Sequence, residues 1–306
     1  MQYHSLSDGV ATRLVAAGLD VNVLRRVIAA GLDEDLANGP DLTTLATVPA
    51  DQRNRGSFGT RSAGCIAGLD VAAAVFDMVC DPDTVKFTKL VNDGDRVQAG
   101  AVLANIEAPT RGLLTAERTA LNILCHLSGV ASATALWVDA LAGTGASVRD
   151  TRKTTPGMRM LEKYAVRRGG GVNHRMSLSD AALLKDNHIV AAGGVAEALG
   201  AVRKLQRDIA IEIEVDSLDQ LREALQAGAD LVLLDNMSPE LMRQAVQIAN
   251  EHMARTSKLV VLEASGGITL ASAKAVAQTG VRYIAVGALT HSAGVLDIGL
   301  DLQSIM

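Results

Sequence analysis

Carboxylates stand near the carboxyl ends of three successive predicted strands. They are Glu214, Asp235 and Glu263, in the predicted strands 210–215, 231–235 and 259–263. Parallel α/β barrels place their active sites at this end of the strands, so we expect the three acids to converge on one rim. The alternative is that each acid only caps a helix or faces solvent. Glu212 shares a strand face with Glu214 and is a weaker candidate.

Basic side chains gather in the segment before these acids, at predicted strand ends or beside the glycine run 169–171. They are Arg152, Lys153, His174, Arg175 and Lys185. A guanidinium offers a planar fork that matches a carboxylate or phosphate, and an ammonium offers a compact charge. We therefore predict a pocket for an anion, with a solvated basic surface as the alternative.

Two turns that contain glycine follow the last two predicted strands. The first holds Ser265, Gly266 and Gly267, and the second runs from Gly287 to His291. Glycine lets backbone N–H groups approach a phosphate closely, and the N-terminus of the following helix favours negative charge. Barrels often bind phosphate at these late loops. The turns thus predict a phosphate site, and two ordinary connections are the alternative.

Elements that alternate between strand and helix must hold these residues. The predicted strands are 147–150, 210–215, 231–235, 259–263 and 283–286, and the predicted helices are 195–206, 218–227, 239–251 and 270–278. This alternation indicates a parallel sheet with right-handed crossovers. Because the segment is short for a barrel of ~250 residues, we expect an incomplete TIM-like α/β barrel.

The first third of the chain has a mixed pattern. It predicts helices over 21–36 and 70–79, a short capped helix after 40–44, and strands over 55–62, 85–91 and 101–107. The sequence Asp93-Gly94-Asp95 predicts a tight turn in a small sheet; a carrier-type hairpin would need an exposed lysine that is missing there. A long helix over 115–141, with Thr115 as its N-cap and Gly129 at a kink or boundary, is the predicted joint between two domains.

Composition narrows the class of protein. The net charge of −5 over 306 residues argues against a general nucleic-acid-binding surface. Three cysteines without a CxxC pair indicate a reducing compartment and no structural zinc site. Neither a signal peptide nor a membrane span is predicted, so a cytoplasmic enzyme is expected. No dinucleotide, metalloprotease or serine-hydrolase motif occurs.

Several segments, taken together, resemble the quinolinate phosphoribosyltransferase family, also called nicotinate-nucleotide pyrophosphorylase (carboxylating). The matching segments, in chain order, are Asp33–Leu36, Asp41–Thr44, Glu117–Asn122, Asp150–Gly157, Lys163–Val166, Gly169–Arg175, Lys185–His188, Leu234–Met237 and Glu263–Ile268. The run Asp-Thr-Arg-Lys-Thr-Thr-Pro-Gly, followed by Gly-Gly-Gly-Val-Asn-His-Arg, is the most specific part. The resemblance covers nearly the whole chain.

The resemblance implies an α/β architecture with an N-terminal α+β open sandwich over 1–116 and an incomplete barrel over 117–289. Residues from about 290 to 306 would return to the first domain. It also implies a homodimer, with assembly into a hexamer left open, in which Arg118 reaches into the partner's site.

Residue roles follow from the same resemblance. Arg118, Arg152, His174 and Arg175 would clamp the two carboxylates of quinolinate, with Lys185 near both this acid and the pyrophosphate. Lys153 would hold pyrophosphate as it leaves the donor, phosphoribosyl pyrophosphate. Glu214 and Asp235 would bind the ribose hydroxyls, directly or through Mg²⁺. The 5′-phosphate would bind at Ser265, Gly266, Gly267, Gly287 and His291. The reaction would give nicotinate mononucleotide, pyrophosphate and CO₂ in de novo NAD biosynthesis.

Two rival interpretations stay open at this point. A related phosphoribosyltransferase that acts on another acceptor acid, such as the molybdenum-transport-associated paralogue, would share the phosphate-binding residues. A non-catalytic, carrier-type binding protein is the alternative from another class, and the convergent acids argue against it. Glu263 is expected to support the site rather than to touch substrate. Lys163, Arg167 and Arg168 have no predicted role and are expected to be exposed.

Overall fold

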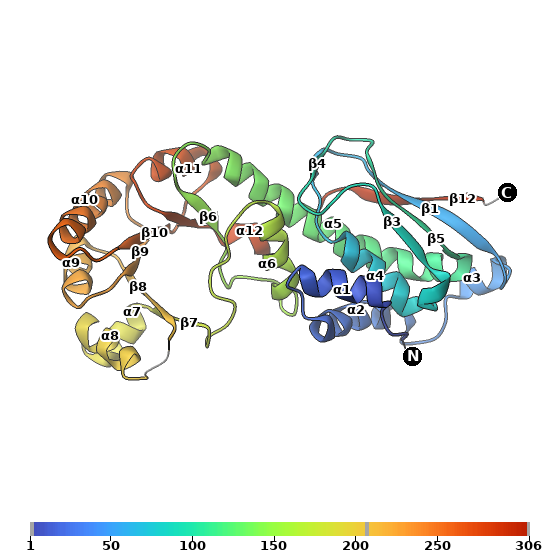
Figure 1. Ribbon diagram of the computed structural model, residues 1–306, viewed down its shortest axis with the longest axis horizontal. Coiled ribbons are helices and arrows are strands. Elements are labelled where there is room, and N and C mark those ends of the chain that lie inside the picture. The colour runs from blue at the N-terminus through green and yellow to red at the C-terminus, as the bar shows by residue number, and fades with distance from the viewer. Residues whose placement is uncertain (1–2, 206–207, 305–306) are drawn as a thin grey trace. The chain divides into compact units, whose positions relative to one another are not determined.

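The computed structural model describes residues 3–205 and 208–304, and the chain divides into two compact units. The N-terminal unit comprises residues 1–135, 155–170 and 292–306, and the barrel unit comprises 136–154 and 171–291 (Figure 1). The predicted domain boundary at residue 116 falls inside helix α5 (Thr110–Ala140), and the two units divide later in the same helix.

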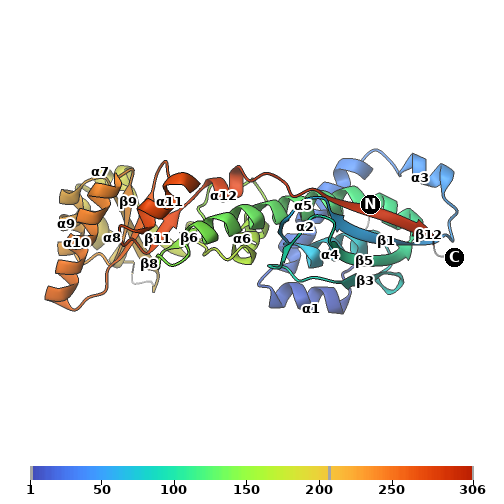
Figure 2. The same cartoon turned by 90° about the horizontal axis from the view of Figure 1, so that it is seen from above.

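The N-terminal unit is built on a four-stranded antiparallel sheet in the order β12-β1-β5-β3. Its strands are β1 (Arg53–Thr60), β3 (Lys86–Lys89), β5 (Val102–Pro109) and β12 (Ile298–Ser304). Figure 2 shows β12 beside β1, so the last strand of the chain completes the sheet of the first domain. A small pair, β2 (Gly64–Cys65) and β4 (Arg96–Val97), lies next to the predicted Asp93 turn.

Residues alternate between buried and exposed along β1, so one uncharged face of the strand, from Asn54 to Thr60, turns toward the core. Phe58 is fully buried and meets Phe76 of α4 (Leu69–Val79) edge to face, with ring centroids 6.0 Å apart. Gly56 allows close packing, because a Cβ there would lie 2.7 Å from Leu300 of β12. The core of this unit therefore lies between the sheet and its helices.

The other helices of the N-terminal unit are α1 (Asp8–Ala16), α2 (Val21–Leu36), α3 (Leu42–Thr47), a 3₁₀ turn (Pro82–Thr84) and α6 (Arg159–Arg168). Helix α2 has the predicted bounds, and its buried residues recur at helical spacing. Asp41 caps α3 as predicted, since its carboxylate accepts the N–H of Thr44 at 3.0 Å. In the predicted tight turn, Asp93 accepts the N–H groups of Gly68 and Leu69 at the start of α4.

Helix α5 differs from its prediction in two ways. It begins at Thr110, so Thr115 lies inside the helix and is not its N-cap. The helix also continues through Gly129, where a Cβ would lie 1.9 Å from the carbonyl oxygen of Gly294; the glycine allows a close chain crossing rather than a kink. Helix α5 is long and apolar enough to cross a membrane, but 61% of its most apolar window is buried in the protein, as in a core helix.

The barrel unit contains a six-stranded parallel sheet in the order β6-β11-β10-β9-β8-β7. The strands are β6 (Ser147–Arg149), β7 (Ala181–Leu184), β8 (Ala210–Val215), β9 (Leu231–Asp235), β10 (Val261–Ser265) and β11 (Tyr283–Ala285). Within the described residues the edge strands β6 and β7 do not pair with each other. The sheet is therefore open, which confirms the predicted incomplete barrel.

Helices follow the strands in alternation and lie outside the sheet (Figure 1). They are α7 (Asp186–Ala192), α8 (Val195–Arg203), α9 (Leu218–Gln226), α10 (Pro239–Thr256), α11 (Leu270–Ala277) and α12 (Ala288–His291). Sequence patterns did not predict β7 or α7, which are short. Residue 206, the predicted end of the helix before β8, lies outside the described residues.

Candidate active site

A cavity of about 780 Å³ opens in the barrel unit and brings together the predicted site residues of that unit. Its lining includes Arg152, Lys153, His174, Arg175, Lys185, Glu214, Asp235, Glu263, Ser265, Gly266, Gly267, Gly287 and His291. Arg118 is exposed on α5 in the N-terminal unit and does not line this cavity. Residues spread over about 140 positions of the chain meet because parallel strands present their carboxyl ends on one side.

Two acids stand at the rim of the sheet, as predicted. Glu214 lies opposite Leu233, and Asp235 lies opposite Ser265 in the parallel register. Lys185 donates to Glu214 with its Nζ 2.6 Å from Oε2, and this ammonium is half exposed toward the cavity. The rim therefore combines carboxylates with a cation that is paired with one of them.

Glu263 departs from its predicted place. Strand β10 ends at Ser265 rather than at Glu263, so Glu263 lies two residues below the rim and its side chain is completely buried. The prediction that Glu263 ends the strand was wrong. The predicted strand covered 259–263, whereas the strand in the sheet covers Val261–Ser265. Glu263 thus belongs to the floor of the cavity.

The two arginines of the pocket are held near each other. Arg175 donates from Nη1 to the carbonyl oxygen of Ala181 at 3.0 Å. Burial, and then the positive charge of Arg152, lowers the pKa of Arg175. The Nε of Arg152 is buried and has no acceptor in the part of the chain that the structure describes. Two guanidinium groups that repel each other, one with an unsatisfied donor, are prepared for an anion.

A buried carboxylate fixes the loop that carries Arg175. Asp150, fully buried after β6, accepts the side-chain amide of Asn173 at 2.5 Å and the backbone N–H of His174 at 2.8 Å. Hydrogen bonds from backbone N–H groups to an ionised acid are among the stronger ones. Asp150 therefore joins the end of β6 to the segment after the glycine run.

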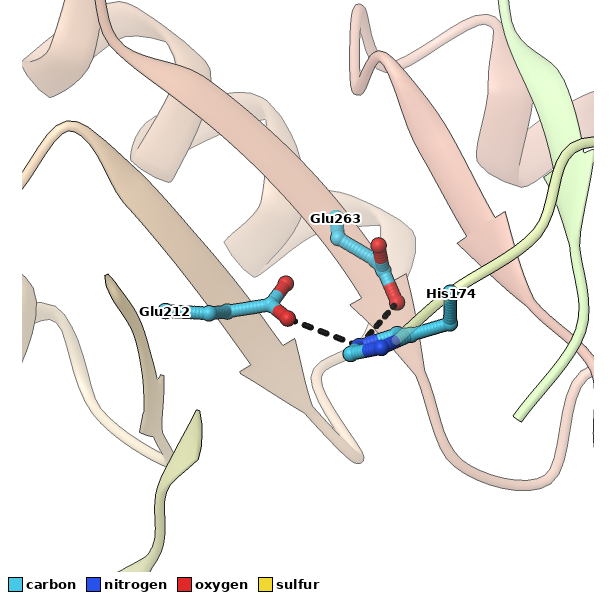
Figure 3. A group of neighbouring side chains, drawn as sticks. All are labelled: His174, Glu212 and Glu263. Atoms are coloured by element: carbon cyan, nitrogen blue, oxygen red, sulfur yellow. Dashed lines mark ion pairs between the residues drawn. The ribbon is translucent and has the colours of Figure 1, made fainter. Parts of the chain in front are cut away.

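His174 and two acids form a buried cluster under the cavity (Figure 3). The Nε2 of His174 lies 2.7 Å from Oε2 of Glu212 and 3.8 Å from Oε1 of Glu263. Arg149 of β6 reaches the other oxygen of Glu263 at 2.5 Å and stacks 4.8 Å from the ring centroid of Tyr283. Burial, followed by the charge of Glu212, raises the pKa of Glu263 to about 7.

Sequence reasoning gave Glu212 too little weight and missed Arg149. Glu212 is a buried residue in the middle of β8, where apolar residues are usual, and Arg149 is the last residue of β6. The available signal was strand parity, which places Glu212 and Glu214 on one face. A charged residue in the middle of a strand is therefore a strong candidate for a role in the site when it shares a face with a predicted site residue, even if it lies away from the strand end.

The expectation of exposure was wrong for Lys163. This lysine is completely buried in α6, where it lies within the buried run 161–166. Arg167 is exposed as expected, and Arg168 is half-buried with its guanidinium 4.8 Å from the ring centroid of Tyr164. Glu162 and Tyr164, the sequence neighbours of Lys163, are polar, so the local sequence gave no signal of this burial.

The two glycine turns that line the cavity have backbone conformations or close contacts that a residue with a side chain would disturb. Gly266 and Gly267 have φ of 95° and 59°, and a Cβ on Gly266 would lie 2.1 Å from Oδ1 of Asn236. A Cβ on Gly287 would lie 3.0 Å from Cδ of Lys153 and 3.3 Å from Nε2 of His291. The absence of side chains there leaves room beside Lys153 and exposes backbone along the cavity wall.

Comparison with known proteins gives a consistent result for both units. The N-terminal domain model of the quinolinate phosphoribosyl transferase family matches residues 41–128, and its C-terminal domain model matches residues 130–301. A nicotinate-nucleotide pyrophosphorylase (carboxylating) of Mycobacterium leprae is 52% identical over 269 residues, which cover 88% of this chain and 93% of that protein.

Solved structures agree with these matches. The nicotinate-nucleotide pyrophosphorylase of Francisella tularensis is 39% identical with a TM-score of 0.86, over 93% of this chain and 98% of that one. The structure of NadC from Streptococcus pyogenes is 39% identical with a TM-score of 0.87, over 94% of this chain and 99% of that one.

Proposed function

Because the chain belongs to the quinolinate phosphoribosyl transferase family, we propose that it transfers the phosphoribosyl group of phosphoribosyl pyrophosphate to quinolinate. The products are nicotinate mononucleotide, pyrophosphate and CO₂, as de novo NAD biosynthesis requires. One observation carries the proposal. A single cavity is lined by four cationic side chains (Arg152, Lys153, Arg175 and Lys185), by two rim carboxylates and by the two glycine turns.

The acceptor side of the cavity suits a dicarboxylate. Arg152 and Arg175 present planar donor groups near each other, and Lys185 adds a compact charge beside them. Quinolinate would relieve the repulsion between the two guanidinium groups, which a singly charged or neutral ring would do less well. His174, also predicted as a member of this clamp, lines the same cavity.

The donor side suits a phosphorylated sugar. The turns at Ser265–Gly267 and at Gly287 would receive the 5′-phosphate through backbone N–H groups, with His291 beside them. Lys153 would neutralise the pyrophosphate as it leaves. Glu214 and Asp235 would bind the ribose hydroxyls, and their negative charge would favour the positive ribosyl centre that develops in the transition state.

The rim acids also fit a magnesium ion, which prefers carboxylate oxygens, phosphates and water. Oε2 of Glu214 is held by Lys185, and Oδ2 of Asp235 is held by the Asn236 amide at 2.8 Å. Among the described residues, the second oxygen of each acid has no hydrogen bond, so it is available to the ion or to its water. When bound, Mg²⁺ would supply positive charge to the pyrophosphate and ribose oxygens.

The chemistry then balances with the groups at hand. The bond between the ribosyl carbon and pyrophosphate breaks, and the pyridine nitrogen of quinolinate forms the new bond to that carbon. The ring nitrogen becomes positive, so the adjacent carboxylate leaves as CO₂ and its electron pair stays on the ring carbon, which takes a proton from water. The protein holds the reacting groups together and stabilises charge.

We further propose a cytoplasmic homodimer, in which Arg118 of one subunit completes the clamp of its partner. The exposure of Arg118 on α5 and its distance in sequence from the barrel loops support this arrangement. Assembly of such dimers into a hexamer is compatible with the same contact. The three unpaired cysteines, Cys65, Cys80 and Cys125, agree with a reducing compartment.

A product assay tests the proposed reaction. Purified protein, Mg²⁺ and phosphoribosyl pyrophosphate are mixed with quinolinate and, in parallel, with nicotinate. We expect nicotinate mononucleotide and an equal amount of CO₂ from quinolinate alone. A folded protein that forms no product would contradict the proposal and favour a family member with another acceptor acid.

Complementation tests the shared site. Arg118→Ala and Arg175→Ala proteins are each expected to be nearly inactive. Mixed under subunit exchange, they would form heterodimers with one intact site, so activity should return. No recovery in heterodimers verified by mass would show that Arg118 does not act across the interface.

A further inference from the structure

A buried hydroxyl group behind the wall of the cavity has no role in the proposed reaction. It belongs to Thr290 in the short helix α12, which is 1% exposed and does not line the cavity, although Gly287 and His291 of the same turn do. A buried hydroxyl group usually has a hydrogen-bond partner, because burying it without one is unfavourable. The partner of this hydroxyl group therefore shows what Thr290 does.

The hydroxyl group donates to the loop that carries two cations of the site. Oγ1 of Thr290 lies 2.6 Å from the carbonyl oxygen of Lys153 and 3.2 Å from that of Gly287. A hydroxyl group has one hydrogen, and the carbonyl oxygen of Gly287 already accepts the backbone N–H of Thr290 at 3.2 Å. The hydrogen therefore points to Lys153, and this bond joins two segments that are 137 residues apart.

Threonine hydroxyl groups hold both backbone polar groups of Lys153. Its N–H donates to Oγ1 of Thr151 at 3.0 Å, and its carbonyl oxygen accepts from Thr290. The side chain of this lysine then passes the glycine turn, where a Cβ on Gly287 would lie 3.0 Å from its Cδ. Fixing the backbone limits the positions that the ammonium group can reach, so less conformational entropy is lost when an anion binds it.

We propose that Thr290 is a positioning residue for the departure of pyrophosphate: its hydroxyl group holds the backbone of Lys153 beside the turn 287–291 and so places the ammonium group for the leaving pyrophosphate. The turn that receives the 5′-phosphate and the lysine that neutralises the pyrophosphate are thereby fixed relative to each other. The two phosphorylated ends of one donor molecule are then held at a set separation. The inference rests on the proposed function for the identity of the anion, whereas the hydrogen bond does not.

Variants of similar shape separate the hydroxyl group from the packing of the side chain. Thr290→Val keeps the size and branching but leaves the carbonyl oxygen of Lys153 without this donor, and Thr290→Ser keeps the hydroxyl group without the methyl group. Thr279→Val is the matched control, because Thr279 is a buried threonine of the same unit that does not line the cavity. Its Oγ1 donates to the carbonyl oxygen of Val276 at 2.7 Å, so both valine variants lose one buried hydrogen bond.

Calorimetric titration with inorganic pyrophosphate and Mg²⁺ measures the effect without any turnover. Positioning predicts that Thr290→Val weakens pyrophosphate binding about fivefold to tenfold, as for one lost hydrogen bond, while Thr290→Ser and Thr279→Val stay within about twofold of the wild type. In steady-state assays the KM for phosphoribosyl pyrophosphate should rise in Thr290→Val, and the KM for quinolinate should change by less than about twofold. A Thr290→Val affinity equal to that of Thr279→Val, or a Thr290→Ser affinity as weak as that of Thr290→Val, would overturn the proposal.

A double-mutant cycle shows whether Thr290 acts through Lys153. Lys153→Met alone should weaken pyrophosphate binding at least about tenfold, and adding Thr290→Val should then change the affinity by less than about twofold. A full additional loss in the methionine background would show that Thr290 acts elsewhere, which overturns the proposal. No binding by the wild type, or an affinity that Lys153→Met leaves unchanged, would refute both this role and the place of Lys153 in the proposed function. If the wild type binds pyrophosphate through Lys153 but does not turn over quinolinate, the proposed reaction fails and the positioning role stands.

Discussion

The two sheets of this protein use their inner faces in opposite ways. In the N-terminal unit the buried face of β1 and β5 carries no charged residue and includes Phe58 and Ile106, while a charged pair, Arg55 with Glu107, lies on the outer face. In the barrel unit Glu212 and Glu263 are buried among the strands with Arg149 and His174 beside them, and Glu214 and Asp235 line the cavity. The N-terminal sheet uses its buried face for packing, whereas the barrel sheet places charged residues where apolar side chains would otherwise pack.

The difference follows from the direction of the strands. An antiparallel sheet sends successive strand ends to opposite edges, so no single edge collects the polar residues that follow strands. A parallel sheet brings every carboxyl end to one edge, where charged residues from distant segments meet. Burying these charged residues is unfavourable, so the site needs compensating ion pairs such as Arg149 with Glu263.

Removal of an apolar anchor from the packing sheet should give the largest effect. Phe58→Ala leaves a cavity between β1 and α4, and we expect the free energy of unfolding to fall by ~3–5 kcal/mol. Urea denaturation measures the loss. Below the unfolding transition the KM for quinolinate should stay unchanged. A loss smaller than ~1 kcal/mol would contradict the view that this face is a tightly packed core.

The charged layer of the barrel should make stability depend on pH. The folded pKa of Glu263 is raised from an ordinary 4.5 to about 7, so the folded protein binds the extra proton between these values. This contribution to the free energy of unfolding is present below pH 4.5 and is lost as pH rises toward about 7, by ~3 kcal/mol. Urea unfolding of wild type and Glu263→Gln across this range measures the difference. Parallel curves would show that Glu263 ionises normally.

A cation of the clamp should affect activity more than stability. Arg175→Ala removes a charge-assisted, forked contact, so we expect quinolinate binding to be nearly abolished, with KM raised about hundredfold, or ~2–3 kcal/mol. The unfolding midpoint should change little. Steady-state kinetics with each substrate varied in turn measures this, and unchanged quinolinate affinity in a folded variant would refute the assigned role.

The outer face of the packing sheet should tolerate change. Arg55 lies 2.6 Å from Glu107, but the two side chains are 50% and 31% exposed, and such pairs are weakened by solvent. Arg55→Gln should alter neither the unfolding midpoint nor turnover beyond the scatter of repeated measurements. A clear loss of activity would reveal that this face takes part in the site.

Local patterns predicted most of the elements, because hydrophobic periodicity reports directly on which face is buried. Helix α2 and strands β8 and β9 have the predicted bounds. Short elements such as β7 escaped prediction, since four residues carry too little periodicity. The predicted start of α5 was misplaced because threonine often caps helices, whereas Thr115 lies inside the helix, which begins at Thr110.

By itself the sequence determined most of the alternating strands and helices, the open parallel barrel, and the set of charged residues that line the cavity. These properties depend on residue types and spacing, which a linear pattern records. Tertiary structure decided what no spacing records: that Lys163 is buried, that Gly129 lets Gly294 approach, and that Glu212 meets His174. Burial and pairing depend on which distant segments pack together, so a charged residue shows its role only when its neighbours are in place.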